Sequence, residues 1–141
     1  MEKRSVKLWV VDDDRLDREL LVEALDITGL PYQVQEFTNG KEVLDSLTAS
    51  QVDDFPNFIL LDLNMPVMDG RETLKQIKGS EQYRIIPVFI LSTSNAQPDI
   101  YSSYQSGANL FFVKPVSFSE LQNTLKSLLS LFQGSVATLT V

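Results

Sequence analysis

The chain has 141 residues, a formal net charge of −7 and neither cysteine nor histidine. That length suits one domain with a substantial buried core. The acidic balance argues against a nucleic-acid-binding or anionic-membrane surface, because such surfaces concentrate Lys and Arg. Without cysteine there is no disulfide or thiolate metal site, and without histidine the commonest general base is missing. The sequence has no apolar run long enough for a membrane span or a signal-peptide core, so we expect a cytoplasmic protein.

Five apolar, strand-like runs alternate with five amphipathic, helical stretches along the chain. The strands are predicted at Val6–Val11, Tyr32–Phe37, Phe58–Leu61, Ile86–Leu91 and Leu110–Val113. The helices are predicted at Asp14–Thr28, Asn39–Ala49, Asp69–Lys78, Pro98–Ser106 and Ser117–Phe132. This alternation predicts an α/β fold with a doubly wound, five-stranded parallel sheet of the (βα)5 type.

The starts of the first and last helices carry capping signals. Asp14 is predicted to cap the first helix, since its side chain can accept a backbone N–H of the first turn. Ser117 and Glu120 have the spacing of a capping box, and Val116 and Leu121 that of a hydrophobic staple. We therefore expect the last helix to be fixed at its start by both devices.

Carboxylate, hydroxyl and ammonium side chains follow four of the predicted strands, at the point where each strand ends. These residues are Asp12, Asp13, Asp62, Ser92 and Lys114. In open α/β sheets ligands bind outside the carboxyl ends of the strands, so we expect one shared pocket. Crowded carboxylates need a counter-charge, which a hard divalent cation and an opposing lysine supply. The sequence predicts a site for handling a phosphoryl group.

The order and spacing of these residues resemble the receiver domain of two-component response regulators. The matching features are the acidic cluster, the segment from Leu61 to Gly70 (LDLNMPVMDG), Ser92 and the pair Lys114-Pro115. The resemblance covers about residues 7–132 and implies a flavodoxin-like sheet with strand order 2-1-3-4-5. It places the receiver domain at residues 1–133 and a short tail at 134–141. The segments 92–94 and 107–109 also look like those of phytochrome-associated stand-alone regulators.

The resemblance assigns roles around a magnesium ion. Asp62 resembles the nucleophile that takes a phosphoryl group from a histidine kinase. Asp13 and Asp62 resemble the Mg²⁺ carboxylate ligands, with the backbone carbonyl of Asn64 as a third oxygen and Asp12 acting through water. Such roles agree with the chemistry: Mg²⁺ takes one or two carboxylates, and an ionised carboxylate needs no histidine base.

Three further residues receive roles from the same resemblance. The hydroxyl of Ser92 is expected to bond a phosphoryl oxygen, where threonine is more frequent, and Lys114 to contact the phosphoryl group from the other side. Phe111 holds the place of the switch aromatic, where tyrosine is common. Although only about 5–6% of X–Pro bonds are cis, the resemblance also predicts a cis bond between Lys114 and Pro115.

Each residue also has a simpler interpretation. The acidic run at 12–14 has the composition of a solvated turn with a helix cap, and Asp62 of a turn before Asn-x-Pro. Ser92 fits a cap or turn residue, and Lys114 a surface lysine. The four together, in order, favour the functional interpretation.

Three other kinds of protein compete with this prediction. A phosphatase of the haloacid dehalogenase type would use the acidic run, Ser92 and Lys114. It also needs an acidic pair after the lysine, where only Glu120 is found. A flavodoxin-like cofactor binder would need free amides after the first strand, where three aspartates repel phosphate. A degenerate receiver used as a scaffold is disfavoured, because every expected site residue is present.

We therefore expect a phosphoacceptor in signal transduction and not an enzyme. Its expected partners are a histidine kinase or phosphotransfer protein and an unknown downstream protein, without nucleic acid or membrane. With no second domain after the last helix, output is expected from its own surface, with a homodimer through the fourth helix, fifth strand and fifth helix as one form. A relay intermediate that passes the phosphoryl group onward is the alternative.

Overall fold

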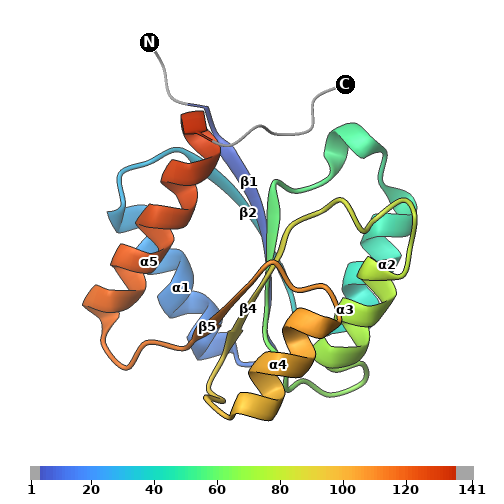
Figure 1. The fold of residues 1–141 in the computed structure, drawn as a ribbon. Helices are drawn as coiled ribbons and strands as arrows, with labels where there is room; N and C mark the ends of the chain where they lie inside the picture. Colours follow the sequence, from blue (N-terminus) through green and yellow to red (C-terminus); the bar gives the residue numbers. More distant parts are fainter. Residues whose placement is uncertain (1–3, 136–141) are drawn as a thin grey trace.

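A parallel five-stranded sheet forms the centre of the computed structural model, which describes residues 4–135 (Figure 1). The strands are β1 (Val6–Val11), β2 (Tyr32–Phe37), β3 (Phe58–Leu61), β4 (Val88–Ser92) and β5 (Leu110–Val113). Their order is β2-β1-β3-β4-β5. The predicted fold class, strand number and strand order are confirmed.

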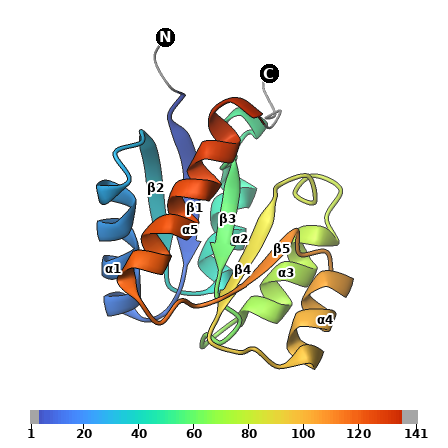
Figure 2. The same ribbon diagram turned by 60° about the vertical axis from the view of Figure 1, so that its left-hand side comes forward.

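The helices connect successive strands and lie on both faces of the sheet. They are α1 (Arg15–Ile27), α2 (Gly40–Ala49), α3 (Gly70–Lys78), α4 (Gln97–Gln105) and α5 (Phe118–Ser130). A short 3-10 helix (Val52–Asp54) precedes β3, and a π-helical turn (Leu131–Ser135) follows α5. Figures 1 and 2 show α1 and α5 together on one face and α2, α3 and α4 on the other. No helix in the described part of the chain is long and apolar enough to cross a membrane.

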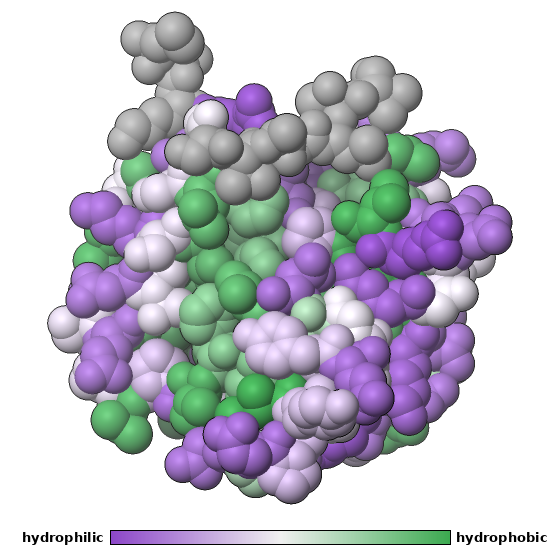
Figure 3. Space-filling view, viewed as in Figure 1, coloured by the Kyte–Doolittle hydropathy of each residue, from purple (hydrophilic) through white to green (hydrophobic). Residues whose placement is uncertain are grey.

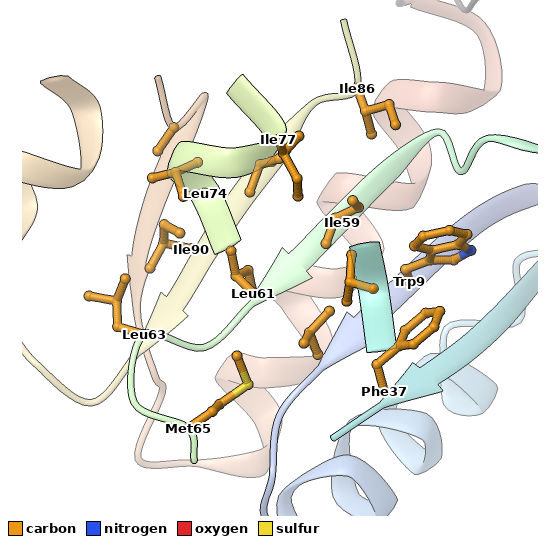
Figure 4. Close-up of a cluster of buried hydrophobic side chains, with 14 of the residues drawn as sticks. Trp9, Phe37, Ile59, Leu61, Leu63, Met65, Leu74, Ile77, Ile86 and Ile90 are labelled. Atoms are coloured by element: carbon orange, nitrogen blue, oxygen red, sulfur yellow. The ribbon is translucent and has the colours of Figure 1, made fainter. Parts of the chain in front are cut away.

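Two apolar cores hold these layers together. Figure 4 shows the core beneath α2 and α3, where Trp9 and Phe37 pack with rings 4.8 Å apart. The core beneath α1 and α5 contains Phe58, Phe89 and Phe132 in mutual contact. Because β3 and β4 are buried at every residue, the strands that lead into Asp62 and end at Ser92 are enclosed on both faces.

The fourth strand begins later than the sequence predicts. Pro87 has no N–H for the ladder, and the N–H of Val88 is bonded by the side chain of Asn109 at 2.9 Å, so the pairing starts at Val88. At its other end the strand continues to Ser92, which pairs with Val113. The hydroxyl residue therefore belongs to the end of the strand itself.

The predicted helix caps are correct, but the predicted staple is not. Asp14 accepts the N–H of Asp17 at 3.1 Å, and Ser117 accepts that of Glu120 at 3.1 Å. Val116 is fully exposed, whereas Leu121 packs against the core beneath α1 and α5. With Leu121 turned to that core, Val116 has no apolar partner to contact, and the staple prediction is wrong.

Candidate functional site

The carboxyl ends of β1 and β3 bring two aspartates together. Val11 and Leu61 are partners in the parallel register, so Asp12 and Asp62 leave the sheet side by side. The N–H of Asp62 bonds the carbonyl of Val11 at 3.0 Å, which carries the pairing one residue past the strand end. Both side chains are buried. Strand geometry alone thus fixes the first pair of the site.

A third carboxylate completes an oxygen cluster at this point. Asp12, Asp13 and Asp62 each offer one oxygen, and the three atoms lie within 4.8 Å of one another. Asp13 is exposed, so the cluster has one side open to solvent. Three convergent carboxylate oxygens suit a hard divalent cation such as Mg²⁺. The expected grouping of these residues is what the structure contains.

Lys114 supplies the positive charge beside the cluster. Its Nζ lies 2.9 Å from Asp12 Oδ2, 3.0 Å from Asp17 Oδ2 and 3.6 Å from Asp62 Oδ2. Burial on its own would lower the pKa of Lys114, but its hydrogen bonds with Asp12 and Asp17 outweigh burial and raise that pKa above the ordinary lysine value. The ammonium therefore stays charged throughout the physiological pH range.

The peptide bond after Lys114 is trans, because residues 4–135 contain no cis peptide bond. Our prediction of a cis bond between Lys114 and Pro115 is therefore wrong. The trans form is intrinsically favoured by about 0.5–1 kcal/mol. It also suffices here, since the N–H of Lys114 bonds the carbonyl of Ser92 at 2.7 Å while the side chain reaches the carboxylates.

Burial raises the pKa of the Asp62 carboxyl above its ordinary value. Lys114 opposes that rise, while the neighbouring charges of Asp12 and Asp13 add to it. The negative charge of Asp62 is therefore incompletely compensated by the protein alone. A bound cation would relieve that imbalance.

The segment after Asp62 is held close to the start of α3. The N–H of Gly70 bonds the carbonyl of Leu63 at 2.9 Å. A Cβ at Gly70 would lie 1.9 Å from the carbonyl oxygen of Asp62, so only glycine allows this approach. Val67, at the exposed tip of the loop, has φ +69°, which is uncommon for a β-branched residue. The backbone around Asp62 is thus tightly specified.

The remaining expected residues lie around the cluster. The Asn64 N–H is 3.5 Å from Asp62 Oδ1, and the fully buried Ser92 accepts the N–H of Ser94 on its hydroxyl at 3.2 Å. Phe111 is half-buried against the core, and its N–H donates to the hydroxyl of Tyr104 at 3.0 Å. Asn64 thus lies in the loop that follows β3, and Ser92 lies at the end of β4.

Sequence reasoning missed three residues at this end of the molecule. Asp17 shares Lys114 with Asp12, and its place one turn after the cap Asp14 was a signal that it faces the site. Arg71 contacts both Asn64 and Asp99, at 3.1 and 3.2 Å. Because residues 71 and 99 are 28 positions apart and on different helices, no local pattern indicates their contact.

Comparisons with known proteins agree with this geometry. Residues 8–126 match the family model of the response regulator receiver domain. The chain is 33% identical over 129 residues to the probable methanogenesis regulatory protein FilR2 of Methanothrix harundinacea, covering 90% of this chain and 83% of that protein. It also matches longer regulators, of which it spans 22% to 51%.

Two solved structures share the fold almost from end to end. The Mn²⁺-bound form of response regulator Rcp1, a protein of Synechocystis, has a TM-score of 0.83 and 28% identity, covering 96% of this chain and 99% of that one. The phosphorylated cyanobacterial phytochrome response regulator RcpA has a TM-score of 0.83 and 35% identity, covering 98% and 100%. One of these similar structures thus holds a divalent metal, and the other is phosphorylated.

Proposed function

This chain belongs to the response regulator receiver domain family, and from that premise we propose that it accepts a phosphoryl group on Asp62 in two-component signal transduction. The observation that carries the proposal is the buried Asp62 carboxylate beside Lys114 and two further carboxylates. The proposed receiver domain is residues 1–133, acting in the cytoplasm as a signalling module and not as an enzyme. Residues 136–141 of the proposed tail lie outside the described residues.

The proposed reaction is in-line transfer to a carboxylate oxygen. A donor histidine on a kinase or phosphotransfer protein presents its phosphoryl group, and an oxygen of Asp62 forms a bond to phosphorus. The phosphorus–nitrogen bond breaks, and the imidazole nitrogen keeps the electron pair. The transition state is loose, so catalysis is positioning and charge neutralisation. Lys114 provides part of that charge, and the hydroxyl of Ser92 is proposed to bond a phosphoryl oxygen.

Mg²⁺ is the proposed cofactor, and it would supply the rest of the charge neutralisation. Asp13, Asp62 and the backbone carbonyl of Asn64 would hold it, with Asp12 acting through water. Two direct carboxylates and several waters are the usual Mg²⁺ arrangement. The oxygen cluster within 4.8 Å supports this assignment, as does the Mn²⁺-bound relative.

The proposed output surface is the face made by α4, β5 and α5. Figure 3 shows apolar residues gathered in a strip over β5 and the adjoining side of α5. The exposed large apolar side chains here are Tyr101 and Tyr104 on α4, Leu110 and Val113 on β5, Val116 in the loop after β5 and Leu131 in the turn that follows α5. Phe111 is the proposed switch aromatic at this face, which would receive a downstream protein or a second copy of this chain. Onward transfer in a phosphorelay is the alternative outcome.

Incubation with a small phosphodonor tests the proposal without a kinase. Intact-mass measurement should show one added phosphoryl group on the native protein with Mg²⁺, and none with a chelator. Asp62→Asn should add none, whereas Asp45→Asn, an exposed change on α2, should behave as native. Equal incorporation in Asp62→Asn would rule out the assignment.

A further inference from the structure

We infer that Arg71 is a positioning residue that couples the two loops on either side of the phosphorylation site. The coupled residues are Asn64, two positions after Asp62, and Ser94, two positions after Ser92. The inference rests on the proposed function, because the coupling acts on a phosphoryl group carried by Asp62. It assigns to Arg71 a role in how the protein responds once that group is present.

A continuous chain of polar contacts links the loops. One arm of the Arg71 guanidinium donates to Asn64 Oδ1 at 3.1 Å, and the other donates to Asp99 Oδ1 at 3.2 Å. The second oxygen of Asp99 accepts the hydroxyl of Ser94 at 2.6 Å. The N–H of Ser94 in turn donates to the hydroxyl of Ser92. Both ends of the chain therefore reach a residue of the proposed site.

The shape of the arginine side chain suits this link. Its planar guanidinium presents donors in two fixed directions, whereas lysine offers one compact ammonium. The Arg71 and Asp99 side chains are 39% and 30% exposed, so their pairing contributes little to stability on its own. The hydrogen bond from Ser94 and then that from Arg71 lower the pKa of Asp99, so this carboxylate stays ionised and able to accept both. The contact is suited to fixing the positions of Asn64 and Asp99 relative to each other.

The helix at the far end of the link is weakly held by apolar packing. Among the residues of α4 only Ser103 is buried. Polar contacts hold its two ends: Asp99 in the first turn, and the Tyr104 hydroxyl, which accepts the N–H of Phe111. A shallow cleft lined by Arg71 and Ser102 separates it from α3, which lies alongside in Figure 2. Polar bonds at its two ends therefore contribute to the position of α4.

A movement of Ser92 toward a phosphoryl group on Asp62 would consequently be transmitted along this chain of hydrogen bonds. The N–H of Ser94 follows the hydroxyl of Ser92, Asp99 follows Ser94, and Arg71 transmits the displacement to Asn64. The loop after β3 and the start of α4 then respond together to one event at Asp62.

A double-mutant cycle with beryllofluoride, a phosphoryl mimic, tests this coupling. The dissociation constant is measured with Mg²⁺ for Asn64→Ala, Ser94→Ala and the double variant, in the native and the Arg71→Ala backgrounds. With Arg71 present, the double variant should depart at least about threefold from the product of the single effects. In Arg71→Ala the effects should simply multiply. The two effects should also multiply in an Arg71→Lys background, which keeps the positive charge but not the two guanidinium arms.

Controls separate coupling from loss of charge or fold. Arg84→Ala removes a cation from the segment that precedes β4, and it should leave the departure from multiplied effects unchanged. If Arg71→Ala fails to fold, Asp99→Ala removes both carboxylate oxygens, breaks the same link from its other end and should abolish the departure. If the effects of Asn64→Ala and Ser94→Ala simply multiply in the native background, the inference is wrong. It is also wrong if their departure from multiplication is unchanged without Arg71. Either result leaves the proposed function standing. Failure of native protein to bind beryllofluoride would overturn the proposed function and this inference with it.

Discussion

At the level of single residues, the main property of the site is its uncompensated negative charge. Asp12, Asp13 and Asp62 converge, and the nearby Lys114 is shared with Asp17, so negative charge exceeds positive. An excess of this kind, held together by the strand ends, destabilises the protein until a cation or a proton compensates it. Two predictions follow from that imbalance, one for metal and one for pH.

Magnesium should stabilise the folded protein. A ligand that binds only the folded state adds about 2.7 kcal/mol at a hundredfold excess over its dissociation constant. Asp13→Asn should reduce this gain and raise the stability of the metal-free protein, because it removes one ligand and one repelling charge. Thermal melts with Mg²⁺ or chelator measure both effects, with Asp45→Asn as the matched surface control. Melts that do not depend on Mg²⁺ would contradict the shared cation site.

The pKa of Asp62 makes a separate prediction about pH. Burial raises this pKa in the folded state above its unfolded value, so folded protein keeps a proton where the unfolded chain has lost it. Stability then falls as pH rises from the unfolded pKa through the folded one. Metal-free Asp62→Asn should therefore melt higher than native protein at pH 7, roughly 4 °C for each kcal/mol. Below pH about 4, near the unfolded pKa, the difference should vanish. A difference independent of pH would contradict the cause we assign.

At the level of elements, the site depends on how closely α3 approaches the end of β3. Gly70→Ala would place a methyl group 1.9 Å from the backbone oxygen of Asp62 and force helix and strand apart. We expect a loss of about 1–3 kcal/mol in unfolding free energy, as for other overpacked sites, together with weaker phosphoryl uptake. Gly134→Ala is the matched control, since a Cβ there meets nothing within 4 Å. Denaturant unfolding of both variants would decide, and equal losses would count against the close approach.

Elements were also where the sequence was most informative. Apolar runs located β1, β3 and β4, because buried parallel strands are apolar on both faces. The partly exposed β2 and β5 were located by their place in the alternation of strands and helices. The same strand ends indicated Asp12, Asp62 and Lys114. The start of β4 was placed too early because Pro87 has no N–H for the ladder and the N–H of Val88 donates to the side chain of Asn109. The exposure of Val116 depends on three-dimensional packing and was not predictable in this way. The trans bond after Lys114 is what the frequency of X–Pro bonds alone indicates, and the resemblance led to the wrong prediction.

Contacts between distant segments were the other gap. Asp17 and Arg71 received no role from the sequence beyond their places in the helices predicted at Asp14–Thr28 and Asp69–Lys78. Their roles depend on which helices the topology brings to the mouth of the site. Sequence spacing carries that information for residues at strand ends, where the parallel sheet aligns them, but not for residues on helix surfaces.

At the level of the whole molecule, a signal at Asp62 has to reach a face that another protein can contact. The loop after β4, helix α4 and strand β5 form the proposed route, through Ser92 and Phe111. With beryllofluoride and Mg²⁺, amide hydrogen exchange should change in residues 92–106 and 110–114. It should stay constant in α2, which follows β2 at the edge of the sheet opposite β5. Changes confined to the loops after β1 and β3 would mean that output uses another surface.

The most direct test of the whole account is to locate the phosphoryl group on the chain. Borohydride reduces an aspartyl phosphate to homoserine, which marks the modified position permanently for peptide sequencing by mass spectrometry. After treatment with a small phosphodonor and Mg²⁺, homoserine should appear at position 62, and it should be absent when a chelator is present. Homoserine at position 12 or 13, or modification undiminished by the chelator, would contradict the assignment of Asp62 as the nucleophile beside Lys114.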